Sequence, residues 1–322
     1  MEIDWDIRPN HLYYAAMLSG KHIYLLMISF TLLTSFTHIL GKPAAVHFPT
    51  ILLTFLRLTI ATVTLTLILT IRKKPFKISR GDTFAFIRLA LIGVVGNILL
   101  FLWGLKYTIP AHPGLLYATT PVWTLIIAGL FKREIILRQK IIGVFISVVG
   151  VMVVMGGTVL NLNLDYLFGD VLILAAVLCW SAYTVFSKPY VMKYHALTAT
   201  FAITAVGMLV LSPLGIWSAV QFDFSSVPLA GWVGLFYMGM FTSATSYLIY
   251  YAVLKQVQPT QLAIIITGQA PTTAILSWLI QGYGLTWIFI LGSLLTLNGI
   301  YITLKLPPSA RAAMHYDGGD AR

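Results

Sequence analysis

Ten stretches of this 322-residue chain are long and apolar enough to cross a membrane, and they constrain its fold more than any other feature. Crossing about 30 Å of hydrocarbon takes roughly 20 apolar residues as a helix, because every backbone polar group must be paired within the segment. With 58% hydrophobic and 10% charged residues, the chain has more apolar surface than a soluble protein of this length can cover. The sequence predicts an all-α polytopic membrane protein with ten transmembrane helices, near residues 22–41, 49–71, 84–105, 112–131, 140–157, 168–187, 196–217, 229–253, 260–280 and 285–305.

The second half of the chain repeats the first at offsets of about 146 to 150 residues. The matching residues are Lys42-Pro43 with Lys188-Pro189, Pro121 with Pro271, and Gly143 and Gly150 with Gly292 and Gly299. Because each copy holds an odd number of spans, the second copy must enter the membrane in the opposite orientation. Inverted repeats of this kind place a substrate site near the midplane between the halves, so the pattern favours a transporter.

The charge distribution orients the chain and sets its predicted boundaries. Of the 21 Lys and Arg residues, Arg57 and Arg88 lie in spans and only Lys42 and Lys106 lie on the side opposite the termini. This asymmetry predicts a cell inner-membrane protein with both termini in the cytoplasm, and it explains the net charge of +11 without nucleic-acid binding. We expect a cytoplasmic leader over 1–21, two five-helix repeats over 22–157 and 168–305 joined by a linker over 158–167, and a cytoplasmic tail over 306–322.

Spaced motifs resemble those of a known family of membrane proteins. They are Phe55-Leu-Arg57, Asn97 followed by Leu105-Lys-Tyr-Thr108, Pro121, and Glu134 with Gln139, Gly143 and Gly150 in a Glu-x-x-x-x-Gln-x-x-x-Gly pattern. On these residues the chain resembles the drug/metabolite transporter superfamily, in particular its EamA-type ten-span exporters. The resemblance implies outward transport and a central cavity lined by spans 1, 3, 4, 6, 8 and 9. Tyr283 stands at the position equivalent to Glu134, so the second repeat departs from the pattern.

The ten acidic residues lie outside the predicted spans except Asp170, which falls in the first turn of the sixth. Without a carboxylate inside the membrane, we expect no metal site, and facilitated diffusion or exchange ranks above proton antiport. His38 is the only histidine in the interior of a predicted span and is the alternative proton carrier. No nucleotide-binding motif or acidic cluster for metal and diphosphate is present, so we expect no cofactor and no enzyme activity.

The candidate substrate-binding residues are polar and aromatic side chains near the midplane: Ser35, His38, Asn97, Tyr117, Thr120, Trp180, Tyr183, Ser246, Tyr247 and Gln269. An apolar site with a few hydrogen-bonding groups suits an organic solute, although each residue could instead bond to a neighbouring helix. Arg57 is interpreted either as an anchor for a substrate carboxylate or phosphate, or as a structural arginine. Pro121 and Pro271 interrupt spans 4 and 9 and form either a pair of hinges or static kinks.

These features predict a secondary transporter that exports small organic metabolites, amino acids or related compounds, by alternating access without a proton gradient. A proton-coupled carrier of drugs or organic cations, and a nucleotide-sugar carrier of the same superfamily, are the alternatives. The expected partners are a small-molecule substrate and the lipid bilayer. The glycines repeated in spans 5 and 10 are explained either by packing within the chain or by a homodimer surface, and the sequence leaves this open.

Overall fold

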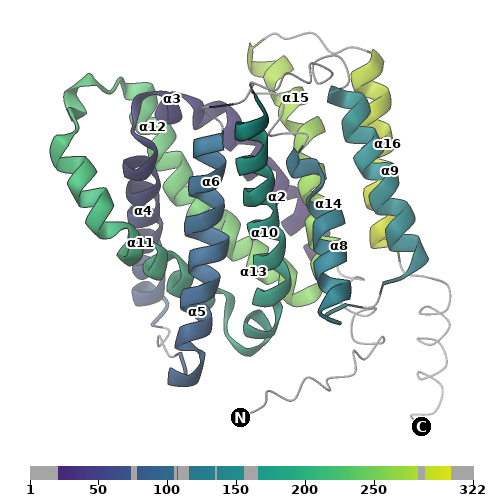
Figure 1. Cartoon of the computed structure of the whole chain (residues 1–322), viewed down its shortest axis with the longest axis horizontal. Helices are drawn as coiled ribbons and strands as arrows, with labels where there is room; N and C mark the ends of the chain where they lie inside the picture. Colours follow the sequence, from purple (N-terminus) through teal and green to yellow (C-terminus); the bar gives the residue numbers. More distant parts are fainter. Residues whose placement is uncertain are drawn as a thin grey trace.

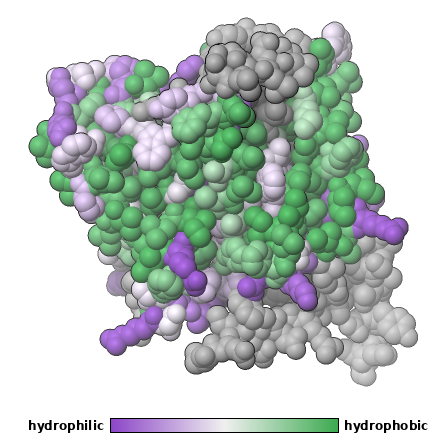
Figure 2. Space-filling model, in the orientation of Figure 1, coloured by the Kyte–Doolittle hydropathy of each residue, from purple (hydrophilic) through white to green (hydrophobic). Residues whose placement is uncertain are grey.

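The computed structural model describes residues 21–73, 78–104, 107, 116–134, 136–155, 166–281 and 287–305, and every element in these residues is a helix. Five helical stretches are long and apolar enough to span a membrane: Thr50–Ile71, Arg80–Gly104, Leu167–Lys193, Ala196–Gln221 and Pro259–Ile280. Three shorter apolar helices accompany them, over Ile23–Thr37, Thr120–Leu130 and Ile290–Leu304. Figure 2 shows a largely hydrophobic face whose hydrophilic residues lie mostly toward its upper and lower edges. The predicted all-α polytopic membrane fold is confirmed.

Helices occupy all ten predicted span positions (Figure 1). The first half contains α2 (Lys21–Leu40), α3 (Lys42–His47), α4 (Thr50–Ile71), η1 (Arg80–Asp82), α5 (Thr83–Ala90), η2 (Leu91–Gly96), α6 (Asn97–Gly104), α8 (Thr120–Leu130) and α9 (Arg138–Met155). The second half contains α10 (Leu167–Lys193), α11 (Ala196–Gln221), η4 (Phe224–Ser226), α12 (Leu229–Tyr237), η5 (Met238–Ser246), α13 (Tyr247–Gln256), α14 (Pro259–Thr267), α15 (Gln269–Gln281) and α16 (Trp287–Leu304). Residues 1–20, most of the expected linker and the expected tail lie outside the described residues.

The first helix of the first half, α2, runs antiparallel to the helices α12 and α13 of the second half. The last residue of α2, Leu40, places its carbonyl oxygen against Gly234 of α12, where a Cβ would not fit. Earlier in α2, the ring of Phe30 lies 5.9 Å from the ring of Tyr250 in α13, measured between centroids. Later residues of α2 therefore contact earlier residues of the α12–α13 stretch, which makes the two antiparallel.

The first helix of the second half, α10, runs parallel to α13. The Thr184 hydroxyl lies 2.5 Å from the Tyr250 hydroxyl, and the Lys188 ammonium donates to the Val257 carbonyl over 2.8 Å. Because α2 runs antiparallel to α13 and α10 runs parallel to α13, α2 and α10 run in opposite directions. The two halves are therefore threaded antiparallel, which is the arrangement that an inverted repeat requires.

The last helices of the two halves, α9 and α16, lie side by side with their backbones in contact (Figure 1). A Cβ added to Gly143 would lie 2.8 Å from the Gly299 carbonyl oxygen, and one added to Gly150 would lie 2.8 Å from that of Gly292. Only glycine permits so close an approach of two helices. Packing within the chain accounts for all four glycines, so they provide no evidence for a homodimer surface.

The third helical stretch of each half contains a π-helical segment. The first, η2, begins at Leu91, and the second, η5, begins at Met238, so their starts are separated by the same interval as the sequence repeat. A π-helical turn holds an extra residue and frees backbone carbonyls, and such segments are frequent at functional sites. Polar residues accompany both: Asn97 directly follows η2, and Ser243 and Ser246 lie in η5.

The sequence predicts that the sixth span ends near residue 187, because a proline at 189 disfavours further helix, and this predicted end is wrong. The helix α10 continues through Pro189 to Lys193. Contacts beyond the proline hold the final turn, because Tyr190 packs its ring 5.7 Å from that of Phe86 and Lys193 pairs with Asp82 over 2.6 Å. Pro43 does follow the end of its helix, since α2 stops at Leu40 and Pro43 lies in the first turn of α3.

We expect the substitution Lys193→Gln to change stability little. The lysine side chain is 55% exposed, and exposed ion pairs contribute about 0–1 kcal/mol. The Asp82 carboxylate also keeps its second partner, the Tyr194 hydroxyl at 2.5 Å. Thermal unfolding in detergent should show less than about 1 kcal/mol of destabilisation. Unfolding of the variant at room temperature would contradict this assignment of a minor role.

Candidate functional site

An arginine occupies the interior of the bundle where the two halves meet. Arg57 is the eighth residue of α4, and its Nε donates to the Ser243 hydroxyl in η5 over 2.9 Å. The residue as a whole is half-buried. Among the described residues no carboxylate forms an ion pair with it. A charge at this depth of a membrane protein needs a partner or a water-filled cavity, which makes Arg57 a candidate for function.

Asn97 and Tyr117 lie in the same part of the bundle interior as Arg57. The Asn97 side-chain amide donates to the Tyr117 hydroxyl over 2.8 Å and to the Ala176 carbonyl over 2.9 Å. The side chains of Tyr117 and Tyr247 lie near the Arg57 guanidinium. We call Arg57, Asn97, Tyr117, Ser243 and Tyr247 the central polar cluster. It draws on both halves, and it includes Asn97, the residue that follows η2, and Ser243 of η5.

Ser246 adds an unused hydroxyl to η5, directly before Tyr247. Its side chain is 1% exposed, and its oxygen has no hydrogen-bond partner among the described residues. Leaving a buried hydroxyl unpaired costs about 1–3 kcal/mol. Binding of water or of a polar solute group would recover that free energy, so Ser246 remains a candidate binding residue.

Aromatic side chains from α10 and α13 pack beside the central polar cluster. The ring of Trp180 lies 5.3 Å from Tyr183, 5.8 Å from Tyr247 and 5.2 Å from Tyr250. The Tyr183 hydroxyl donates to the Tyr251 hydroxyl over 2.9 Å, and both rings are almost fully buried. We call these five residues the aromatic cluster. It fills the space between the middle of α10 and the first half of α13.

Lys188 closes the end of the bundle where α10 and α13 finish. Its ammonium donates to the carbonyls of Leu254 and Val257, which belong to the last turn of α13 and the residue after it. Cations stabilise a helix C-terminus because the final carbonyls lack partners within the helix. The repeat-equivalent Lys42, at the opposite end of the bundle, is exposed. The closure by a lysine is therefore present at one end only.

A buried ion pair ties the loop before α9 to the start of α14. Glu134 pairs with Lys140 over 2.5 Å and accepts from the backbone N–H of Thr260 over 3.0 Å, while Lys140 also donates to the Gln258 side chain. The side chains of Glu134 and Lys140 are 0% and 5% exposed. Glu134, which carries part of the sequence resemblance, therefore joins the two halves at the end that Lys188 closes.

The other predicted site residues lie in packing contacts. Ser35 donates to the Gln269 carbonyl over 3.4 Å, and Thr120 donates to the Tyr117 carbonyl over 2.5 Å. No described contact joins Ser35 or Gln269 to the central polar cluster. His38 lies in α2, but its side chain is outside the described part of the structure.

The two repeated prolines each follow a break in a helix. Pro121 lies in the first turn of α8 after a turn at Thr119, and Pro271 lies in the first turn of α15 after the break at Gly268. The sequence placed these interruptions at equivalent points in spans 4 and 9. Their action as hinges stays a prediction.

Sequence reasoning missed the contact of Lys188 with the end of α13, and it missed Tyr250 and Tyr251 as members of the aromatic cluster. A lysine before a proline at a predicted helix end indicates an exposed residue, and the second half gave no sign that α13 would end beside it. Tyr250 and Tyr251 follow Tyr247 closely, and this run of tyrosines in an apolar helix was the available signal.

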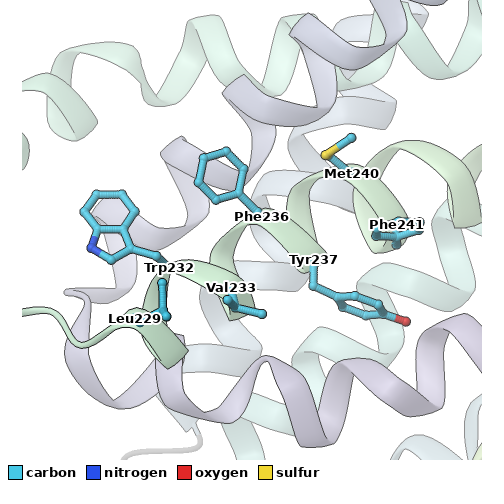
Figure 3. A pocket seen from close by; sticks show the side chains of 7 residues that line it. All are labelled: Leu229, Trp232, Val233, Phe236, Tyr237, Met240 and Phe241. Atoms are coloured by element: carbon cyan, nitrogen blue, oxygen red, sulfur yellow. The ribbon is translucent and has the colours of Figure 1, made fainter.

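A separate pocket of about 360 Å³ lies on the outer face of α12 and η5 (Figure 3). Its lining is almost entirely apolar: Leu229, Trp232, Val233, Phe236, Tyr237, Met240 and Phe241. Most of these side chains are among the exposed large hydrophobic residues. The Tyr237 hydroxyl is used for packing, since it donates to the Leu33 carbonyl over 2.9 Å. The pocket offers nothing that would orient a polar solute, and it is distinct from the central polar cluster.

Comparison with known proteins identifies the family. The sequence model of the EamA-like transporter family matches residues 21–156 and again residues 167–305. The uncharacterized transporters YyaM and YetK of Bacillus subtilis (strain 168) are 25% identical over 285 residues (87% of this chain, 93% of the relative) and 28% identical over 281 residues (85% of each).

Two further matches add a named activity and a solved fold. A probable terminal-alkyne amino-acid exporter of Streptantibioticus cattleyicolor is 27% identical over 205 residues, covering 62% of this chain and 65% of the relative. A solved crystal structure with 17% identity superposes with a TM-score of 0.72, covering 88% of this chain and 98% of that one, which supports the fold alone. With an antiparallel two-half helical fold and two family matches that together span most of its length, this protein belongs to the EamA-like transporter family.

Proposed function

We propose that this protein is a secondary transporter that exports small organic metabolites, amino acids or related compounds, across the cell inner membrane. The observation that carries the proposal is the central polar cluster, in which Arg57 of the first half donates to Ser243 of the second. Grouped donors and aromatic rings within an apolar bundle suit an organic solute that carries a polar head. The name of the Streptantibioticus relative, an amino-acid exporter, supports the substrate class.

Alternating access is the proposed mechanism. In an inverted repeat, a contact found at both ends belongs to the scaffold, whereas a contact found at one end only depends on which end is closed. Lys188 closes the end where α10 and α13 finish, and Lys42 is exposed at the other. The positive-inside asymmetry assigns the closed end to the cytoplasm, with both termini on that side. Opening this end while the other closes would expose the central polar cluster to the cytoplasm.

Carriers of organic cations are the less favoured alternative. A cation site in a membrane usually contains a carboxylate, and none lies in the central polar cluster. The described acidic residues Asp82, Glu134, Asp170 and Asp223 lie at or near helix ends. The same absence within the central polar cluster favours facilitated diffusion or exchange over proton antiport.

Uptake into proteoliposomes, with and without a pH gradient, tests the proposal. We expect uptake of at least one amino acid from a panel of apolar, aromatic and small polar ones, with the rate unchanged by the gradient. Empty liposomes are the control. Uptake that requires the gradient and disappears in His38→Ala would overturn the uncoupled mechanism. Transport of organic cations but of no amino acid would overturn the substrate class.

A further inference from the structure

We infer that Arg57 and Ser243 form a subsite for the carboxylate group of the transported compound, and that a substrate amino group is not required for binding. This inference rests on the proposed function and specifies the chemistry of its site. The guanidinium carries five N–H donors, and the structure gives one of them, at Nε, a protein partner. The donors at the two Nη atoms have the spacing of a carboxylate and would bind it through two parallel hydrogen bonds.

A purely structural role fits the surroundings of Arg57 less well. A structural arginine inside a membrane protein pairs with carboxylates or with several backbone carbonyls. In the described residues Arg57 instead bonds a single neutral hydroxyl. The side chain also crosses from α4 to η5, an element of the other half, so it does not extend along its own helix toward the membrane surface. A bound anion would supply the charge that the protein lacks here.

The residues around Arg57 indicate how the rest of the compound would be held. The side chains of Tyr117 and Tyr247 lie near its guanidinium, and Asn97 fixes the position of Tyr117. The rings of Trp180 and Tyr247 meet edge to face with centroids 5.8 Å apart and offer an apolar or cation-accepting surface. The central polar cluster contains no carboxylate that would bind an ammonium group. The carboxylate of the substrate is therefore the anchored group, and its amino group is tolerated.

Binding to the purified full-length protein in detergent tests this inference, with four probes that share one aromatic body. L-Phenylalanine and 3-phenylpropionate carry the carboxylate, while L-phenylalaninamide and phenethylamine do not. We expect both acids to bind at least about tenfold more tightly than either other probe, because bonds between charged groups are worth about that factor or more. Arg57→Gln should abolish this preference, Arg57→Lys should keep part of it, and Ser243→Ala should weaken acid binding several-fold.

The control is Arg88→Gln, which removes an exposed arginine that stacks on Phe84 and lies outside the central polar cluster. It should leave all four affinities unchanged. Retention of the preference for acids in Arg57→Gln would overturn the inference, as would equal binding of acids and amide by the unmodified protein. If Arg57→Gln does not fold, the comparison of Arg57→Lys and Ser243→Ala with the unmodified protein decides, and unchanged acid binding in both overturns it.

The arms of this experiment separate the inference from the proposed function. If amino acids are transported while 3-phenylpropionate fails to bind, the proposed function stands and the independence from the amino group is wrong. If phenyl phosphate, added as a fifth probe, binds more tightly than the acids, the subsite is one for phosphate and the carboxylate assignment fails. If neither acids nor amino acids bind or are transported, both proposals fail together.

Discussion

The substitution Gly299→Val is expected to prevent the last helices of the two halves from packing and to leave little folded protein. A Cβ at Gly299 would lie 2.5 Å from the Gly143 carbonyl oxygen, and backbone atoms cannot move away unless α9 and α16 separate. Overpacking typically costs about 1–3 kcal/mol and more where the neighbour is rigid. Gly299→Ala should show a smaller loss with the same origin. Size-exclusion chromatography after stepwise heating in detergent measures both.

Gly81→Ala is the matched control for this prediction. Gly81 is a glycine of the short helix η1, and the nearest atom to a Cβ there is 3.9 Å away, which is ordinary contact. This variant should unfold within about 1 °C to 3 °C of the unmodified protein, as expected for a substitution that changes packing little. A Gly299→Ala protein as stable as Gly81→Ala would show that α9 and α16 do not cross at these glycines.

The substitution Lys188→Met should weaken the closed end of the bundle without unfolding it. Methionine keeps the length and apolar stem of the side chain but leaves the final carbonyls of α13 without their cation. Losing hydrogen bonds to a charged group costs about 1.5–3 kcal/mol, which corresponds to a roughly 10- to 100-fold shift toward the state in which this end is open. Transport should persist with altered rates.

Cys179, the only cysteine of the chain, reports this shift. It lies in α10, is half-buried, and is within electrostatic range of Tyr117 in the central polar cluster. In Lys188→Met, a membrane-impermeant maleimide added from the side of the closed end should label Cys179 about tenfold faster, the lower limit of the expected shift. Lys42→Met is the matched control, because its lysine is the exposed repeat equivalent, and it should leave labelling unchanged. Equal labelling of the two variants would mean that Lys188 does not hold this end closed.

Much of the fold was predictable because a membrane leaves the backbone few choices. Apolar stretches of membrane-spanning length must be helical, and so the ten predicted spans coincide with helices. The antiparallel threading followed from counting spans within each repeat. Both π-helical segments went unpredicted, because an extra residue in a helical turn leaves no mark in hydropathy or spacing. The continuation of α10 through Pro189 was also missed, since distant contacts with Asp82 and Phe86 outweigh the local preference.

The sequence was sufficient to select most residues of the candidate site, but less so to predict which of them lie together. Asn97, Tyr117, Trp180 and Tyr247 were selected as polar or aromatic residues in apolar spans, and they lie around Arg57 in the structure. Single-sequence reasoning could not separate them from Ser35 or Thr120, which have the same character but bond to neighbouring helices. The separation depends on which helix faces are opposed, and only tertiary packing decides that.

Counterflow in proteoliposomes tests most directly whether one central site is exposed to each side in turn. Vesicles are loaded with a high concentration of the best-transported unlabelled amino acid and diluted into a trace of the same compound carrying a label. A carrier with alternating access should accumulate the label transiently above its external concentration, and Arg57→Gln should greatly reduce this accumulation for acids. Label that only equilibrates, at a rate unaffected by the internal amino acid, would indicate a channel and contradict the account.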